Sequence, residues 1–435
     1  MRKKIVLLAS ALALASAARA APPQANAAEV AARSKIFGAA NVDARTAAVN
    51  PDRVIVSWLT NASFALAARG HVMLLDTYVT RLETTPGRTP VVIGDLTAMM
   101  PEAIMLGHGH FDHADNAAYI AQQTGATIYA SPETCDNMAI DAANNVSRGY
   151  TTNSHVHCVS LTSRGSLPGT EIVGIDQFWP DLDIKVLKHL HSTNTGVTDP
   201  QSVPIAATSG GVCQPTAKGN TFPCNLQDPR DPALFPAGAP LSSVMNIATS
   251  RAGAGGPIAL MFIITVPSRG DGRRDERHDF RLVWNNTAGD LVDSCALPNN
   301  VPGTNPPQPF EPQQDSRGCF PGVTVHGMSV GQNLESIMDR FAPVDVQLGS
   351  VVSLGYNQNG ERDAFTYIQH LQPKVFVPNH VTAVAAEGSS LEWKVAFFQE
   401  AAALGIEQLP EVDWLVDPND YLRPMVFDPS DARWR

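Results

Sequence analysis

The chain has 435 residues, a formal charge of −11 at pH 7 and a hydrophobic content of 44%. This apolar fraction is ample for a large buried core, and the net negative charge disfavours nucleic acid as a partner, because the two would repel each other. Beyond residue 20, no segment reaches the ~18 uninterrupted apolar residues that a membrane helix needs. We therefore expect a large globular protein without a membrane span.

The first twenty residues have the pattern of a cleaved export signal. Positions 2–4 are basic, residues 5–15 form a short apolar segment, and residues 18–20 (Ala-Arg-Ala) match an A-x-A cleavage site. A membrane anchor is the alternative, which the short apolar segment disfavours. We expect a signal peptide over 1–20, a mature chain beginning at Ala21, and a periplasmic or secreted protein.

An exported protein meets an oxidising compartment, in which cysteines pair. The sequence alone does not determine which of the six cysteines pair, and some of them could instead be buried free thiols. The six cysteines fall in three neighbouring pairs, Cys135 with Cys158, Cys213 with Cys224, and Cys295 with Cys319.

The Ala-rich residues 21–50 predict a flexible arm. After the arm, alternating and apolar runs predict several strands and one helix, which together indicate a layered α/β or α+β domain. The expected strands cover residues 54–58, 64–67, 72–75, 103–106 and 126–129, and the expected helix covers 115–123.

The second half of the chain alternates between apolar strands and long polar loops. The strands are expected over 258–266, 280–284, 344–348 and 375–377, and insertions are expected near 193–257, 267–279 and 296–322. Long coil is uncommon in a compact domain unless it is functional or disordered. We interpret residues 51–435 as one domain decorated by these loops.

The strongest chemical signal is Gly-His-Gly-His-Phe-Asp-His at residues 107–113, directly after an apolar strand. Histidine and carboxylate are natural ligands of zinc and related divalent metals. The alternating His108 and His110 can point to one side, and the following turn can bring Asp112 and His113 to a neighbouring point. One loop can therefore supply two adjacent metal sites, whereas the alternative is an exposed His-rich loop.

This His-x-His-x-Asp-His pattern resembles the signature of the metallo-β-lactamase superfamily. Residues 58–64 and 74–77 resemble the first hairpins of the branch that includes ascorbate-phosphate lactonases and N-acyl-phosphatidylethanolamine phospholipase D enzymes. That branch usually has Gly-His where this chain has Thr60-Asn61. The resemblance implies an α/β (α+β) fold, a four-layer αββα sandwich with long loop insertions and with its metals at one edge of the two sheets.

The resemblance also implies ligands from later strand ends. His191 follows the strand pattern at 184–190; His189 has the same parity, and we favour His191 because the strand ends there. Asp290, after a Gly, matches the family's bridging carboxylate, although an ordinary turn residue is the alternative. His380, after the strand at 373–377, matches the last ligand, with a structural histidine as the alternative.

The implied centre contains two divalent metal ions, Zn²⁺ by default, although Mn²⁺ or Fe²⁺ would suit the same ligands. Asp112 and Asp290 are the expected catalytic residues, and Asp76 would support the metal loop from beneath. His326 or Tyr356 could stabilise an oxyanion. One ion would be held by His108, His110 and His191, and the other by Asp112, His113 and His380, with Asp290 between them.

The predicted function is an exported binuclear metal-dependent hydrolase, in which metal-bound hydroxide attacks a lactone or ester of a small organic substrate. One alternative is a phosphodiesterase of the phospholipase D type, acting on a lipid or nucleotide. Another is a non-catalytic metal-binding protein with the same fold. A third is a serine hydrolase, because Gly-Met-Ser-Val-Gly at 327–331 matches the nucleophile-elbow pattern around Ser329.

Overall fold

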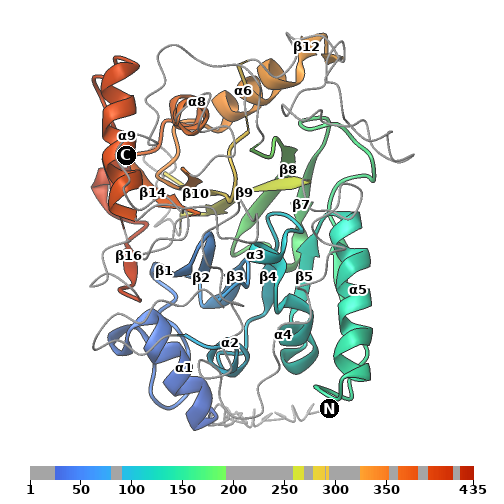
Figure 1. Cartoon of the computed structure of the whole chain (residues 1–435). Helices are drawn as coiled ribbons and strands as arrows, with labels where there is room; N and C mark the ends of the chain where they lie inside the picture. Colours follow the sequence, from blue (N-terminus) through green and yellow to red (C-terminus); the bar gives the residue numbers. More distant parts are fainter. Residues whose placement is uncertain are drawn as a thin grey trace, which may run out of the picture.

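A computed structural model of the chain (Figure 1) describes residues 25–79, 91–192, 258–268, 278–289, 291–292, 324–351, 361–380, 390–414 and 422–435. Several predictions fall outside these ranges. They are the signal peptide, the insertions at 193–257 and 296–322, most of the insertion at 267–279, four cysteines (Cys213, Cys224, Cys295, Cys319), Asp290 and Tyr356.

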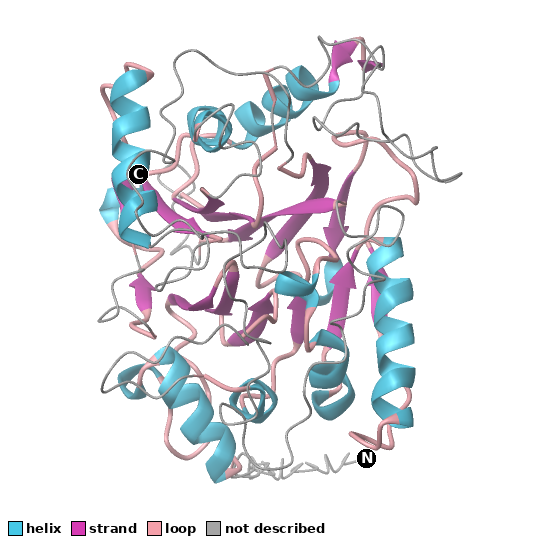
Figure 2. Cartoon of the chain, in the orientation of Figure 1, coloured by secondary structure: helices cyan, strands magenta, loops and turns pink. Residues whose placement is uncertain are grey.

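Two seven-stranded sheets lie face to face between outer helices (Figure 2). The first sheet has the order β16-β1-β2-β3-β4-β5-β6. Strands β1, β2 and β3 pair antiparallel, whereas β3, β4, β5 and β6 pair parallel. Its strands are β1 (Val54–Thr60), β2 (Ser63–Ala68), β3 (His71–Leu75), β4 (Ala103–Met105), β5 (Thr127–Ala130), β6 (Cys158–Ser160) and β16 (Met425–Phe427).

The second sheet has the order β15-β14-β13-β10-β9-β8-β7. Strands β7 to β10 pair antiparallel, and β10, β13, β14 and β15 pair parallel. Its strands are β7 (Ile172–Ile175), β8 (Asp183–His189), β9 (Ala259–Val266), β10 (Phe280–Asn285), β13 (Val346–Ser350), β14 (Val375–Asn379) and β15 (Glu411–Val412). A separate hairpin joins β11 (Thr324–Val325) to β12 (Met328–Ser329).

Helices cover the outer face of each sheet (Figure 1). The short α3 (Phe111–Ala114) lies between the two sheets, at one edge of the sandwich (Figure 1). The first sheet carries α1 (Ala27–Phe37), α2 (Ile93–Ala98), α4 (Ala117–Thr124) and α5 (Pro132–Ser147). The second carries α6 (Val330–Phe341), α8 (Arg362–Leu371) and α9 (Ser390–Ala403). Short 3-10 turns occur at η1 (Ala39–Asn41), η2 (Asp176–Phe178) and η7 (Ala432–Trp434).

The burial pattern follows from this layering. In β1, every residue is buried, because alternate side chains enter different cores. Trp58 belongs to a cluster shared with Phe262 and Trp284 of the second sheet, whereas Ile55 belongs to a cluster with Ile36 of α1. The predicted αββα sandwich is therefore confirmed.

The prediction of a flexible arm over residues 21–50 is wrong from Asn26 onward. Asn26 caps α1 by accepting a hydrogen bond from the Ala28 amide, and Ile36 and Phe37 are fully buried. The Ser57 hydroxyl of β1 donates to the Ile36 carbonyl at 2.6 Å. Alanine is the best helix former, so an Ala-rich segment needs only a few large apolar residues to dock on the sheet.

The structure also bears on the expected cysteine pairing and on the expected absence of a membrane span. The sulfur atoms of Cys135 on α5 and Cys158 on β6 lie within bonding distance, with their Cα atoms 5.6 Å apart, as neighbour pairing predicts. Among the helices that the structure describes, none combines the length and the apolar character needed to cross a bilayer.

Candidate metal centre

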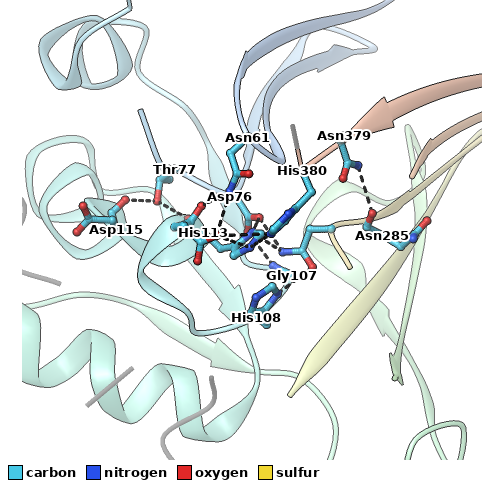
Figure 3. Close-up of polar contacts among 12 residues, drawn as sticks. Asn61, Asp76, Thr77, Gly107, His108, His113, Asp115, Asn285, Asn379 and His380 are labelled. Atoms are coloured by element: carbon cyan, nitrogen blue, oxygen red, sulfur yellow. Dashed lines mark hydrogen bonds and ion pairs between the residues drawn. The ribbon is translucent and has the colours of Figure 1, made fainter. Parts of the chain in front are cut away.

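The predicted ligands follow strands whose carboxyl ends meet at one edge of the sandwich. Strands β3 and β4 run parallel, so Asp76 and the 107–113 loop leave the first sheet together. Strands β8 and β10 both pair antiparallel with β9 and therefore run in the same direction, which is shared by β14. The ends of the strands before His191 and His380 consequently face the loop from the other sheet, and Figure 3 shows His380 beside His113.

The first ligand group consists of His108, His110 and His191, whose nearest ligand atoms all lie within 4.8 Å of one another. The Nε2 atoms of His108 and His191 are 3.3 Å apart. His191 lies two residues beyond β8 and is 6% exposed, and His108 is 2% exposed. Residues from both sheets thus form this group.

The second ligand group consists of Asp112, His113 and His380, which satisfy the same 4.8 Å limit. The Nε2 atoms of His113 and His380 are 3.1 Å apart. One oxygen of Asp112 lies 3.4 Å from the first of these nitrogens and 3.5 Å from the second. The backbone amide of His380 donates to the Asn61 carbonyl at 3.2 Å, which ties this strand end to the β1–β2 turn.

These separations match what a tetrahedral metal requires. Zinc bonds of about 2.0–2.1 Å place the donor atoms of neighbouring ligands about 3.3 Å apart. His191 Nδ1 donates to the Ser192 carbonyl at 2.6 Å, so in the neutral ring Nε2 keeps its lone pair and faces His108. Both groups therefore fit a divalent ion in donor type, and the pair His108–His191 and the second group also fit it in spacing.

Two of the histidines are oriented by polar groups behind them. His113 Nδ1 donates to Asp76 at 2.7 Å, and the Gly107 amide donates to the other oxygen of Asp76 at 2.9 Å. His108 Nδ1 lies 3.0 Å from the Asn286 side-chain oxygen. Such partners fix which ring nitrogen carries the proton and leave the other free for a metal. Asp76 occupies the supporting position beneath the loop that the sequence predicts.

Electrostatics separates the two groups. Burial lowers the pKa values of His108 and His191 well below the ordinary value for histidine, and it lowers the pKa of His110 to about 4. The three histidines of the first group are therefore neutral. Burial also opposes a charge on His113, but the carboxylates of Asp112 and Asp76 outweigh it and raise its pKa to about 10. An ion in the second group must therefore displace a proton.

Asp112 is ionised for a related reason. Burial raises the pKa of its carboxyl group, but the neighbouring His113 and His380 outweigh burial and hold that pKa well below its ordinary value. The Asn61 side chain adds a hydrogen bond of 2.8 Å to the Asp112 carbonyl and a longer one of 3.3 Å to its carboxylate. The second group thus contains an anionic oxygen beside two imidazoles.

The structure distinguishes between the two histidines at the end of β8. His191 joins the first ligand group, whereas His189 belongs to neither group. His189 is buried, its Nδ1 lies 3.2 Å from the Tyr367 hydroxyl, and burial lowers its pKa to about 3. His189 is therefore a neutral histidine of the core.

Asp290 lies outside the described residues, but its neighbour Gly289 is placed. A Cβ atom on Gly289 would come within 2.4 Å of the Leu190 Cβ and 2.7 Å of the His191 carbonyl. The chain therefore reaches residue 289 in direct contact with the strand end that carries His191. The bridging role of Asp290 remains a prediction.

Two other predicted sites have different roles. Ser329 is the N-cap of α6, because its hydroxyl accepts from the Gln332 amide at 3.1 Å in a reciprocal capping box. A helix cap explains this serine without a nucleophilic role. His326 is exposed in the β11–β12 turn and belongs to neither ligand group.

Sequence reasoning missed two asparagines that contact the ligands, Asn61 and Asn286. Asn286 is fully buried and bonds both His108 and Asp76. A signal for it existed in the sequence, since the Asn285-Asn286 pair directly ends an apolar strand where a buried amide needs partners.

Comparison with known proteins gives partial matches. No protein-family model matches the chain. The chain is 31% identical over 104 residues to a UPF0173 metal-dependent hydrolase of Myxococcus xanthus, which covers 23% of this chain and 34% of the relative. A protein of the same description from Methylocella silvestris is 32% identical over 117 residues, which covers 26% and 48%. The chain thus spans less than half the length of these curated relatives.

Among solved structures, Igni18, a metallo hydrolase from Ignicoccus hospitalis, superposes with a TM-score of 0.40 at 12% identity, covering 86% of this chain and 98% of that one. Zn²⁺-bound PqqB from Methylobacterium extorquens gives 0.35 at 12% identity, covering 87% and 88%. At these scores the superpositions carry no argument about activity. The chain combines a two-sheet αββα sandwich, local sequence similarity to metal-dependent hydrolases, and two groups of side chains at one edge that could hold metal ions.

Proposed function

We propose that the chain is a binuclear metal-dependent hydrolase. One ion would be held by His108, His110 and His191, and the other by Asp112, His113 and His380. The observation that carries the proposal is the spacing of donor atoms, 3.1–3.5 Å within the pairs measured, in two adjacent groups. The local similarity to metal-dependent hydrolases supports it.

Asp290 would complete the centre as a carboxylate shared by both ions. The contact of Gly289 with Leu190 and His191 supports this role, because Gly289 precedes Asp290 in the sequence and lies beside the backbone of a first-group ligand. Zinc is the proposed metal, since imidazole and carboxylate suit it, and Mn²⁺ or Fe²⁺ would bind the same donors.

When bound, such an ion pair polarises a substrate oxygen and lowers the pKa of a coordinated water. The side chains divide the remaining tasks. The neutral histidines of the first group present unprotonated nitrogens without a cost in proton release. Asp112 is ionised and its side chain is 18% exposed, so its carboxylate can accept a proton from an attacking water and pass it outward.

The proposed substrate is a lactone or ester of a small organic molecule. The test is a panel of a chromogenic ester, a lactone and bis-p-nitrophenyl phosphate, with and without a chelator. We expect ester or lactone hydrolysis that the chelator abolishes and added zinc restores. Turnover of the phosphodiester alone would overturn the substrate class, and activity that survives chelation but is lost with a fluorophosphonate would overturn the metal mechanism.

We also propose that the protein is exported, with cleavage before Ala21. The basic and apolar pattern of residues 1–20 and the pairing of Cys135 with Cys158 support this. The mass of the protein recovered from its native host is the test. A mature chain that still contains residues 1–20 would overturn the proposal.

A further inference from the structure

We propose that Asn286 is a positioning residue that orients both ligand groups through a single carboxamide. The inference rests on the proposed function, because it assigns Asn286 a task at that centre. The Asn286 side-chain oxygen lies 3.0 Å from His108 Nδ1, and its nitrogen donates to Asp76 at 2.7 Å. Asp76 in turn accepts from His113 at 2.7 Å.

Asp76 determines the donor and acceptor of each hydrogen bond that links His108, Asn286 and His113. Asp76 accepts hydrogen bonds from the Gly107 amide and from His113, and the amide nitrogen of Asn286 faces it as a further donor. The amide oxygen then faces His108, and it accepts a hydrogen bond from this ring only if His108 carries a proton on Nδ1. His108 Nε2 is consequently left with a lone pair, which points toward His191 in the first ligand group.

Asp76 orients the second group in the same way. It holds the Nδ1–H of His113, so that Nε2 of this ring faces His380 and Asp112. Asn286 therefore sets the ring state of His108 directly, and it supports His113 through Asp76 and through its own amide nitrogen, which lies 3.1 Å from His113 Nδ1. The two groups share this one amide.

The residues around Asn286 leave space for its carboxamide next to the metal loop. Asn286 is fully buried, and a Cβ atom on Gly107 would lie 2.1–2.5 Å from the three atoms of its carboxamide. Only a glycine at 107 leaves room for the amide next to the metal loop. Asn286 follows β10 of the second sheet, whereas His108 and Asp76 follow strands of the first, so the bonds cross between the sheets.

A second layer of amides holds the backbone before Asn286 in place. The Asn285 side chain donates to the Thr287 carbonyl at 3.0 Å and accepts from Gln347 at 3.0 Å. Asn379, which precedes His380, donates to the Asn285 carbonyl at 3.2 Å (Figure 3). The position of Asn286 is thus fixed relative to the strand that carries His380.

The first test measures the ring state of His108 in the full chain by histidine ¹⁵N NMR after metal removal. We expect a neutral His108 protonated on Nδ1, and the Asn286→Leu variant should lose this preference because the acceptor is gone. A wild-type His108 that is protonated on Nε2, or a preference that persists in the variant, would overturn the inference. This readout needs neither an ion nor a substrate, so it is independent of whether the proposed function is correct.

The second test is zinc titration of the same proteins. Loss of a partner behind a ligand typically costs about 10–100-fold in metal affinity. We expect Asn286→Leu to weaken both sites within that range. A matched control is Asn333→Leu, which removes a buried amide bonded to the Gly169 carbonyl at 3.0 Å and should leave zinc affinity unchanged. Equal losses in both variants would overturn the inference.

Asn286→Asp provides a second variant of the same size if Asn286→Leu does not fold. Its carboxylate keeps an acceptor toward His108 but replaces the donor toward Asp76 with a second acidic group. We expect His108 to stay protonated on Nδ1 while zinc affinity of the second site falls. Wild-type affinity at both sites would contradict a role for the donated hydrogen bond.

Discussion

Hydrogen-bond partners and burial give each histidine at this edge its chemical state. His108 and His191 are neutral, whereas His113 between Asp76 and Asp112 is held protonated until an ion replaces the proton. The same residue type therefore has two behaviours within one short loop.

Replacing His191 and His189 separately should have unequal effects. His191→Ala removes a donor of the first ligand group, so we expect loss of one ion per chain and of turnover. His189→Gln should keep both ions and lower the free energy of unfolding by about 1–3 kcal/mol, because it disturbs buried polar contacts with Tyr367 and with the backbone of Leu190 and Leu260, not a ligand. Metal content and urea unfolding distinguish the two, and loss of metal in His189→Gln alone would reverse the assignment.

Asp112→Asn should lower turnover by about 10²–10⁴-fold, the range associated with removing a general base. The fold should be retained, because the apolar clusters behind the site do not include this residue. Steady-state hydrolysis and circular dichroism measure the two quantities. Activity within a few fold of wild type would exclude Asp112 as the proton acceptor.

Zinc binding to the second group should depend on pH. The pKa of His113 is raised from an ordinary 6.5 to about 10, so this residue is protonated across the neutral range. Binding releases this proton, so affinity should rise about tenfold per pH unit between pH 7 and 10 and level off above. The same charge stabilises the metal-free fold below pH 6.5, and that stabilisation is lost as pH rises through 10.

The first ligand group is an internal control in that titration. Its histidines have lowered pKa values and are already neutral at pH 7, so its zinc affinity should change little above neutrality. Two sites with the same flat profile would contradict the charged state assigned to His113.

Among the secondary-structure elements, the ends of β8 and β14 are held by backbone contacts with segments that are distant in the sequence. The β8 end that carries His191 is packed against Gly289, and the β14 end that carries His380 is bonded to the β1–β2 turn at Asn61. The ligand geometry therefore depends on backbone contacts around His191 and His380 as well as on the side chains that would bind a metal.

Gly289→Ala should disturb the first ligand group from outside it. The added Cβ would overlap Leu190, an overpacking that costs about 1–3 kcal/mol, and would push on the backbone of His191. We expect a lower urea midpoint and weaker zinc binding at the first site. Gly174→Ala is the control, since its Cβ would meet nothing closer than 3.6 Å. Equal effects of the two substitutions would argue against the close contact.

Much of the element order follows from sequence periodicity. The predicted helix at 115–123 is α4 at Ala117–Thr124, and the strand predicted at 126–129 is β5 at Thr127–Ala130. The arm was mispredicted because weak apolar periodicity in an Ala-rich segment does not reveal the sheet on which it docks. Tertiary burial of Ile36 and Phe37 decides that helix.

At the scale of the whole molecule, the two sheets contribute complementary halves of the candidate site. The first sheet provides the loop with four adjacent ligand-type residues, and this cluster is local enough to be recognised in the sequence. The second provides His191 and His380 as single residues, which only the order of strand ends distinguishes from core histidines. The Asn285-Asn286 pair marks the position of Asn286 in the sequence, but its partners could not be predicted, because they lie on the other sheet.

The most direct test of the account is the metal stoichiometry of the purified full chain, measured by inductively coupled plasma mass spectrometry after equilibration with zinc. We predict two ions per chain in the wild type, and one in His191→Ala. A wild-type chain that retains no ion under these conditions would contradict a binuclear centre formed by the two ligand groups.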